Sequence, residues 1–250
     1  MSLLVAEGLN KRFGAVVAAG DVAVAFDAGE RVSLIGSNGA GKTTFVNMIT
    51  GYLKPDAGRI VFDGRDITAL APRAITHLGV ARSFQIPQLY GDLSVLDNML
   101  VANACHDESL SLRLPAHRPD AVERAERLLE RFRLLDHRNR RVAGLAGGVR
   151  KLLDIAMALT GSPRLLLLDE PTSGVSADEK FPLMDTVMAA LGHDDATCVL
   201  FVEHDMEVVG RYASRVVAFY AGRVVADGAP DEALAADAVR RYVTGELLAE

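Results

Sequence analysis

The sequence is poor in cysteine and has no long apolar segment. Its two cysteines among 250 residues, Cys105 and Cys198, stand in dissimilar surroundings without metal-ligand spacing, which indicates reduced, small apolar side chains. No run approaches the roughly 18 consecutive apolar residues of a membrane helix, and the longest runs, at 164–168 and 198–202, have the length of strands. The first residues lack the basic start and the apolar stretch of a signal peptide. We therefore expect a cytosolic protein.

Basic residues are in deficit, with 27 Lys and Arg against 33 Asp and Glu and a net charge of −6. This balance argues against an extended nucleic-acid-binding surface, although it does not exclude local basic patches. With 50% hydrophobic and 24% charged residues the chain is too apolar to be disordered. It shows no repeat and no low-complexity segment, and its length allows one large domain or two modest ones.

Apolar runs of strand length alternate with helical patterns in the first and last thirds of the chain. Strands are predicted near residues 3–6, 22–26, 31–35, 59–62, 165–168, 197–202 and 216–220, and helices near 41–50, 178–191 and 206–212. Because continuous apolar strands that alternate with helices are typical of a parallel sheet covered on both faces, the pattern predicts an α/β fold.

The middle of the chain, from about residue 87 to residue 159, has a helical pattern. Between 120 and 135 apolar residues recur at three- and four-residue intervals, and the opposite face carries Glu and Arg, most simply as a solvated, ion-paired surface. The segment 105–119 has two prolines and no clear period and is expected to be a loop. We predict an inserted α-helical subdomain at 87–159, with residues 1–86 and 160–250 sharing one sheet.

A glycine-rich segment after the strand at 31–35 matches G-x-x-x-x-G-K-[ST] at every position. Its residues are Gly36, Ser37, Asn38, Gly39, Ala40, Gly41, Lys42 and Thr43. Such a loop aims successive backbone N–H groups and a helix N-terminus at an anion, which predicts a nucleotide phosphate site. Lys42 would reach the β- and γ-phosphates, Thr43 would ligate Mg²⁺, and Thr44 would donate to the α-phosphate. The alternative is a glycine turn that merely caps a helix.

A second apolar strand ends in two carboxylates, Asp169 and Glu170. Buried carboxylates need compensation, and Mg²⁺ supplies it if Asp169 holds the ion directly or through water. Glu170 can then polarise a water for in-line attack on the γ-phosphate. The alternative is that both acids lie in a solvated loop.

With these two motifs the chain resembles the ABC transporter ATPases over nearly its whole length, and further segments occur in that family's order. They are Phe13 in 11–14, Gln85 in 81–85, the signature segment Leu145, Ala146, Gly147, Gly148 and Val149, the loop 173–178, and His204 in 201–205. The resemblance implies a P-loop NTPase core with a mostly parallel sheet, an N-terminal antiparallel β subdomain and the inserted helical subdomain.

The resemblance also implies roles for these residues. Phe13 would stack under adenine, Gln85 would bind Mg²⁺ or the attacking water, and His204 would contact the γ-phosphate. Residues 145–148 would close over ATP bound by the opposite subunit, and the segment 86–93 would border the groove that receives a membrane subunit.

The signature segment departs from the family's usual L-S-G-G-Q, because Ala146 replaces the serine and Val149 the glutamine. Gly147 and Gly148 keep their backbone donors. Without the hydroxyl, a hydrogen bond to the charged phosphate worth roughly 1.5–3 kcal/mol is lost. If the residue also caps the helix, about 1 kcal/mol of helix stability is lost as well. We expect a composite site that closes more weakly, or an asymmetric pairing in which the partner supplies the fuller signature.

Within the family, the segments 81–85, 93–98, 203–206 and 239–242 resemble the ATPases of branched-chain amino-acid uptake systems. That resemblance implies an ATPase that energises solute import from the inner face of the cell membrane. Its partners would be transmembrane subunits, an identical or homologous ATPase subunit, and indirectly a periplasmic solute-binding protein, with no nucleic acid. Urea or amide importers, lipopolysaccharide exporters, a soluble ATPase acting on DNA or the ribosome, and a regulatory nucleotide-binding subunit without hydrolysis remain alternatives.

Overall fold

The computed structural model describes residues 2–106, 117–192 and 196–244. Its larger sheet has six strands in the order β10-β9-β3-β8-β7-β6, and its smaller sheet has four in the order β2-β1-β4-β5. The strands are β1 Leu4–Phe13, β2 Val16–Phe26, β3 Arg31–Ile35, β4 Ala57–Phe62, β5 Arg65–Asp66, β6 Val80–Ser83, β7 Leu165–Asp169, β8 Cys198–Val202, β9 Arg215–Tyr220 and β10 Arg223–Gly228.

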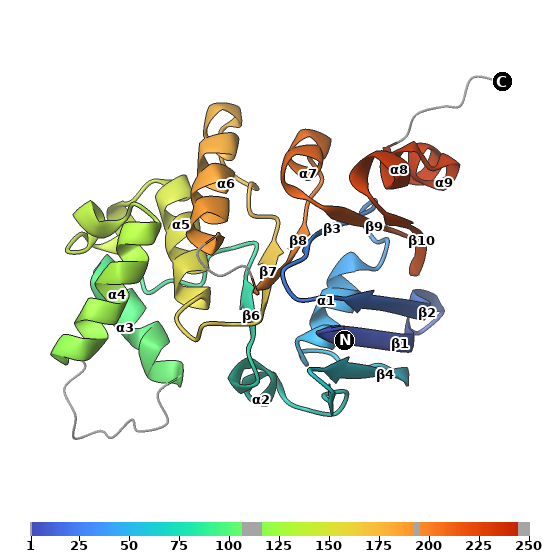
Figure 1. Cartoon of the computed structure of the whole chain (residues 1–250), viewed down its shortest axis with the longest axis horizontal. Helices are drawn as coiled ribbons and strands as arrows, with labels where there is room; N and C mark the ends of the chain where they lie inside the picture. The colour runs from blue at the N-terminus through green and yellow to red at the C-terminus, as the bar shows by residue number, and fades with distance from the viewer. Residues whose placement is uncertain (1, 107–116, 193–195, 245–250) are drawn as a thin grey trace.

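The helices lie around and beside these sheets (Figure 1). They are α1 Lys42–Ile49, α2 Pro72–His77, α3 Val95–His106, α4 Pro119–Arg131, α5 Gly147–Ala158, α6 Ala177–Leu191, α7 Met206–Tyr212, α8 Pro230–Ala235 and α9 Asp237–Val239, with single turns at Leu135–His137 and Val142–Gly144 and a π-helical turn at Arg240–Thr244. None of those within the described residues is long and apolar enough to cross a membrane.

The larger sheet confirms the prediction of a buried, mostly parallel core. Strands β6, β7, β8, β3 and β9 run parallel, and only β10 is antiparallel to its neighbour. Every residue of β7 and β8 is buried, as expected of a continuous apolar strand with both faces covered. Consequently the carboxyl ends of β3, β6, β7 and β8 lie along one edge, where ligands bind in open α/β sheets.

Helix α1 lies between the two sheets (Figure 1). Its buried Phe45, Met48 and Ile49 belong to one apolar cluster with Leu4 of the antiparallel sheet and Leu34 of the parallel sheet. That packing anchors the segment that follows β3 on both sides.

The smaller sheet confirms the expected N-terminal antiparallel β subdomain. The strands predicted at 3–6 and 22–26 are only the outer ends of a longer hairpin, since β1 extends to Phe13 and β2 begins at Val16. Irregular register after Ala6, with Gly8 at φ 58°, disrupts the alternation that would have revealed the full strand.

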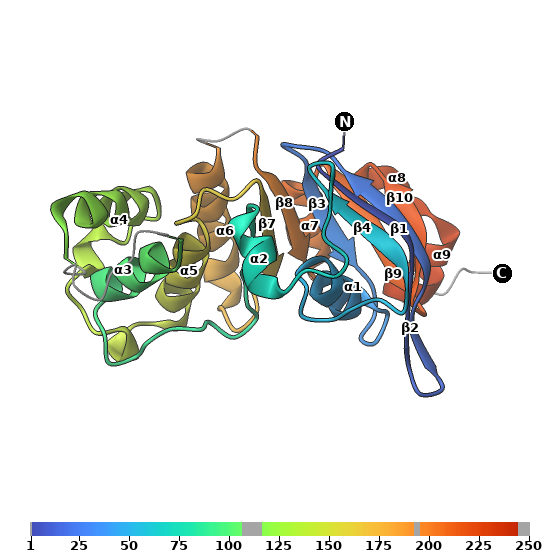
Figure 2. The same ribbon diagram turned by 90° about the horizontal axis from the view of Figure 1, so that it is seen from below.

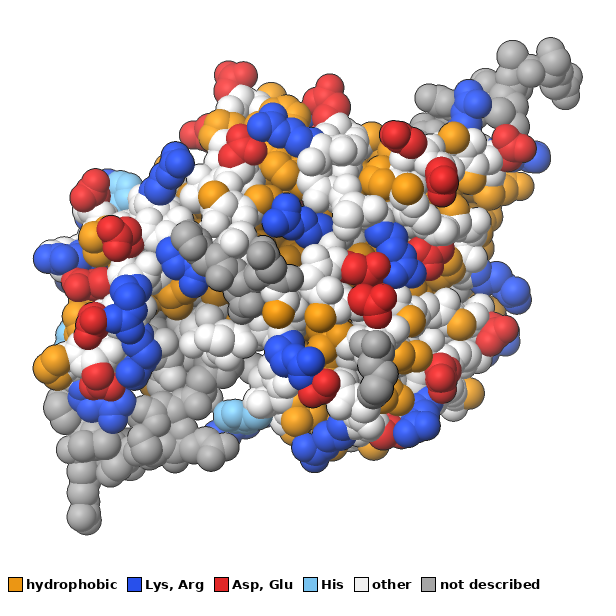
Figure 3. Space-filling view, viewed as in Figure 1, with side chains coloured by type: hydrophobic (Ala, Val, Ile, Leu, Met, Phe, Trp, Pro, Cys, Tyr) orange, Lys and Arg blue, Asp and Glu red, His pale blue; other side chains and the backbone are white. Residues whose placement is uncertain are grey.

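Helices α3, α4 and α5 lie at the opposite end of the molecule from the antiparallel sheet, in both views (Figures 1 and 2). The exposed face of α4 carries the expected ion pairs, such as Arg127–Glu123 at 2.6 Å. In the space-filling view acidic and basic side chains are interspersed over this end (Figure 3).

Two details of this helical region differ from prediction. The helix expected at 120–135 ends at Arg131, because Arg133 takes a left-handed φ of 57° that a helix cannot continue through. The loop expected at 105–119 is wrong at both ends, since α3 includes Cys105 and α4 begins at Pro119, a residue well suited to a first helical turn. The remainder of that loop, 107–116, lies outside the described residues.

Candidate functional site

The phosphate loop joins β3 to α1 in the place that the motif requires. Gly41 occupies the N-cap position of α1 with φ 108°, a conformation that favours glycine. A Cβ atom there would lie 2.6 Å from the carbonyl oxygen of Ala18, so the loop packs directly on β2. This close packing and the left-handed backbone both depend on glycine.

Lys42 lies at the centre of this loop and is 5% exposed. Its Nζ donates to the carbonyl oxygens of Gly36 at 2.6 Å and Ser37 at 3.1 Å. Burial lowers the pKa of Lys42, and the nearby charges of Glu170 and Asp169 partly offset that effect. Backbone carbonyls therefore hold the ammonium within the loop, where it would contact a bound phosphate.

The loop forms one wall of a cavity of about 130 Å³. Residues 38–44 line it together with Glu170 and His204, which are distant in sequence. The structure thus brings most of the predicted phosphate loop into one space with Glu170 and His204, whereas Gln85 and Asp169 are not among the residues that line this cavity.

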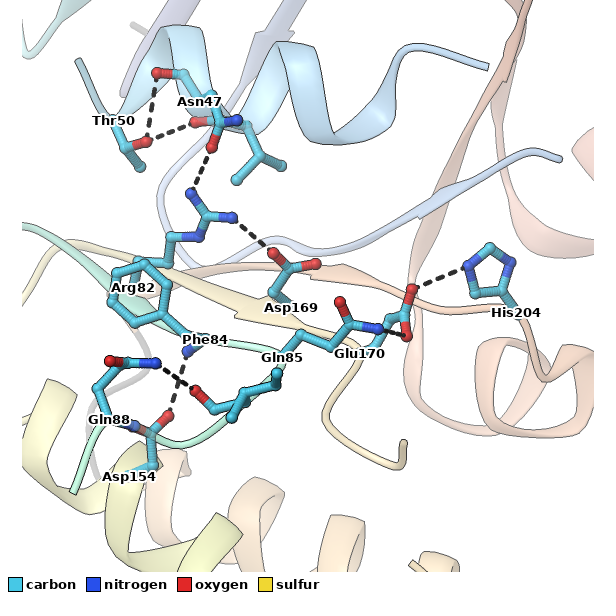
Figure 4. Close-up of polar contacts among 12 residues, drawn as sticks. Asn47, Thr50, Arg82, Phe84, Gln85, Gln88, Asp154, Asp169, Glu170 and His204 are labelled. Atoms are coloured by element: carbon cyan, nitrogen blue, oxygen red, sulfur yellow. Dashed lines mark hydrogen bonds and ion pairs between the residues drawn. The ribbon is translucent and has the colours of Figure 1, made fainter. Parts of the chain in front are cut away.

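Glu170 is held between two side chains from neighbouring strand ends (Figure 4). Nε2 of Gln85, after β6, donates to Oε2 of Glu170 at 2.6 Å, and Nε2 of His204, after β8, lies 3.1 Å from Oε1. Glu170 itself has a left-handed φ of 47°, which turns the chain sharply at the end of β7. A strained backbone held by its surroundings is a recurrent feature of functional sites.

Asp169 is buried and paired with Arg82 (Figure 4). Nη2 of Arg82 donates to Oδ2 of Asp169 at 2.6 Å, and Nη1 donates to Oδ1 of Asn47 in α1 at 2.7 Å. The guanidinium also lies 5.0 Å from the ring centre of Phe84. Arg82 therefore ties β6 to β7 and α1.

The donor set fits Mg²⁺ only in company with a nucleotide. Thr43, Gln85 and Asp169 offer oxygen ligands, which Mg²⁺ prefers. Among the described residues no group of three or more His, Cys, Asp or Glu side chains is placed to hold a metal alone. Mg²⁺ in proteins is commonly held by one or two carboxylates plus substrate phosphates, and this site matches that arrangement.

Phe13 ends β1 opposite Val16, and the residue is 53% exposed. It lies on the hairpin whose Ala18 packs against the phosphate loop, and Nζ of Lys11 is 5.9 Å from the ring centre. Phe13 does not line the cavity, but it offers an exposed aromatic face on an adjoining element.

The segment 145–148 is absent from that cavity. Ala146 is the N-cap of α5, with extended φ −62° and ψ 156° and no side-chain cap, and Gly147 and Gly148 form the first turn. Within one chain, these backbone donors do not meet the phosphate loop.

Sequence reasoning missed four supporting residues, Asn47, Arg82, Lys151 and Asp154. Lys151 and Asp154 are buried charged residues in α5. Their signal was available in the pattern of α5, where Lys151 and Asp154 lie three residues apart and flank apolar positions, while the third charged residue, Arg150, is exposed. Charged side chains at buried positions need paired or hydrogen-bonded partners.

The fold and the phosphate loop define a P-loop nucleotide-binding protein. The model of one protein family, described as "ABC transporter", matches residues 19–173. The chain belongs to the ABC transporter family and is one of its ATP-binding subunits.

Curated relatives support this assignment along nearly the whole chain. The chain is 38% identical to the high-affinity branched-chain amino acid transport ATP-binding protein LivG of Salmonella typhimurium, covering 92% of both chains. It is 35% identical to the protein BraF of Pseudomonas aeruginosa, which has the same description and the same coverage.

Solved structures agree with the fold. A nucleotide-free ATP-binding cassette from an ABC transporter matches with a TM-score of 0.86 and 29% identity over 100% of both chains. The ATP-binding cassette MJ1267 matches with a TM-score of 0.83 and 31% identity over 94% of both chains.

Proposed function

We propose that this chain hydrolyses ATP and thereby energises import of a small polar solute, a branched-chain or other amino acid. The observation that supports hydrolysis is the placement of Glu170, which lines the phosphate-loop cavity and is held by Gln85 and His204. The solute class rests on the names of relatives such as LivG and BraF. A nucleotide-binding subunit does not contact the cargo, so its own site carries no information on the solute.

In the proposed mechanism the loop and Lys42 bind the β- and γ-phosphates. Glu170 orients the attacking water and accepts its proton, while His204 donates to the γ-phosphate as charge develops. Thr43, Gln85 and Asp169 would hold Mg²⁺, which would supply positive charge to stabilise the phosphates. Phe13 would stack on the adenine.

A second subunit, identical or homologous, would contribute its residues 145–148 to this site. Residues 145–148 of the present chain would in turn complete the site of the second subunit. This arrangement accounts for a signature segment that lies outside the cavity of its own chain. We also infer that residues 87–159 form the helical subdomain of the cassette, beside a core of 1–86 and 160–250.

Membrane subunits would dock in a cavity of about 330 Å³. It lies beside the segment 84–94 between β6 and α3, which we call the Gln85 loop. Tyr52, Phe84 and Tyr90 line the cavity, and exposed Ile86 adjoins it in sequence. Exposed apolar side chains gathered around a hollow are typical of a protein-binding surface. Through such partners the chain would lie on the inner face of the cell membrane, with a periplasmic solute-binding protein as an indirect partner.

Lys42→Ala tests nucleotide binding. Loss of charge-assisted contacts of roughly 1.5–3 kcal/mol predicts Mg²⁺–ATP affinity weaker by about 10- to 100-fold. Isothermal titration calorimetry measures it, with Lys54→Ala at an exposed lysine outside the loop as the matched control. Equal affinity in both variants would contradict the role of Lys42, and a wild type without magnesium-dependent affinity for ATP would contradict the proposed function.

Ala146→Ser tests the weakened signature. The extended backbone of Ala146 already suits an N-cap, so a serine there should add about 1 kcal/mol of stability. If the hydroxyl also reaches the γ-phosphate across the dimer, ATP turnover should rise roughly 10-fold or more.

The matched control is Ala229→Ser at the uncapped N-cap of α8. It should raise the melting temperature without raising turnover. An unchanged rate in Ala146→Ser would refute the cost assigned to the missing hydroxyl.

A further inference from the structure

Helix α5 carries two buried charged side chains that the proposed mechanism does not use. Lys151 is 2% exposed and Asp154 is 6% exposed, in a helix whose neighbouring Leu153 and Ile155 are fully buried. Buried charges are costly unless they are paired and hydrogen-bonded, so the contacts of these two residues need an explanation.

Lys151 binds three backbone carbonyl oxygens. Its Nζ donates to Phe84 and Gln85, both at 3.0 Å, and to Asp169 at 3.4 Å. An ammonium has three protons, and these contacts account for all of them. Lys151 therefore joins the loop after β6 to the carboxyl end of β7, the two segments that carry Gln85 and Glu170.

Asp154 binds the other side of the same loop (Figure 4). Oδ2 accepts from the backbone N–H of Phe84 at 3.2 Å, and Oδ1 accepts from that of Gln88 at 3.0 Å. One helical turn of α5 thus supplies a cation for the carbonyls of the loop and an anion for its N–H groups. The chain between β6 and α3 forms no helix or strand. Lys151 and Asp154 hold its first part, from Phe84 to Gln88, and Asn98 of α3 holds the next part by hydrogen bonds to the backbone of Tyr90.

We propose that Lys151 and Asp154 are positioning residues that fasten the Gln85 loop to the signature helix, so that both move as one body. The inference rests on the proposed function, because it concerns the placement of Gln85 against Glu170. Helix α5 begins at Gly147 in the signature segment. A shift of that segment, on meeting nucleotide in the opposite subunit, would therefore be transmitted to Gln85 in its own subunit.

We call the contacts of Lys151 and Asp154 with the Gln85 loop the clamp. Two substitutions remove it in different ways. Lys151→Met keeps an unbranched apolar side chain but removes the ammonium, which leaves three carbonyls without this donor. Asp154→Asn keeps the shape but replaces one acceptor by an NH₂ group that faces a backbone N–H. Lys151→Arg retains the cation and serves as the conservative variant, and Arg150→Met, at an exposed neighbour on the same helix, is the matched control.

The absence of tryptophan from the chain permits a single-tryptophan reporter. Ile86 is 74% exposed and follows Gln85 directly, so Ile86→Trp places the probe on the loop. In the full-length chain, Lys151→Met and Asp154→Asn should lower the fluorescence anisotropy of this probe. Lys151→Arg and Arg150→Met should leave it unchanged.

Turnover provides the second measurement. A loop displaced by about 1 Å should lower kcat at least roughly 10-fold in Lys151→Met and Asp154→Asn, with the Kd for Mg²⁺–ATP within about twofold of wild type. Lys151→Arg should recover most of kcat. Melting temperatures of all variants separate a displaced loop from an unfolded chain.

The outcomes separate this inference from the proposed function. Unchanged anisotropy and unchanged kcat in both clamp variants would overturn the inference while hydrolysis by the wild type stands. A wild type that does not bind or hydrolyse Mg²⁺–ATP would overturn the proposed function, and the anisotropy would still report whether the clamp holds the loop.

Discussion

Glu170→Gln is expected to stop ATP turnover while ATP binding persists. The amide has the shape of the carboxylate and can still contact Gln85 and His204, but it does not accept a proton from water. Loss of a general base lowers kcat by about 10²–10⁴-fold. Because ATP lies between two subunits in the proposed dimer, the variant should also accumulate as an ATP-bound dimer, which size-exclusion chromatography with and without Mg²⁺–ATP will show.

The matched control is Glu123→Gln, an exposed glutamate of α4 that pairs only with Arg127 among the contacts described. Its turnover should equal that of the wild type. If Glu170→Gln retained wild-type turnover and did not dimerise, Glu170 would not be the base, and a regulatory subunit that binds nucleotide without hydrolysis would be the better interpretation.

Arg82→Met is expected to destabilise the protein strongly. The side chains of Arg82 and Asp169 are 9% and 11% exposed, and the substitution would leave the Asp169 carboxylate buried without its partner. Removing one member of such a pair costs about 3–5 kcal/mol. For a chain of this size, that corresponds to a fall in melting temperature of roughly 6–20 °C.

The surface pair Arg127–Glu123 provides the control, since both side chains are more than half exposed. Arg127→Met should leave the melting temperature nearly unchanged because exposed pairs contribute little. Adding Asp169→Asn to Arg82→Met removes the unpaired charge, so the double variant should recover part of the lost stability. A melting temperature for Arg82→Met equal to that of wild type would show that the ion pair is not needed.

The phosphate loop could be recognised from sequence because its properties are local. Gly41 has a left-handed backbone at the N-cap, and the helix predicted at 41–50 is present as Lys42–Ile49. By contrast, the clamp on the Gln85 loop was not foreseen, because Lys151 and Gln85 are 66 residues apart along the chain and nothing in the helical pattern of α5 indicates what its buried charges contact. The predicted boundaries of the helical subdomain and the roles assigned to the site residues stay predictions that the variants above test.

The sequence by itself determined the phosphate loop, the buried parallel strands and the family to which the chain belongs, since these depend on contiguous residues and their spacing. Only the tertiary structure decided that Gln85, Glu170 and His204 meet, because β6, β7 and β8 are neighbours in the sheet although long segments separate them in the chain. It also decided that Arg82 pairs with Asp169 and that α5 holds the Gln85 loop. The physical reason is that a hydrogen bond or an ion pair depends on distance in space, and strand order and helix packing determine that distance.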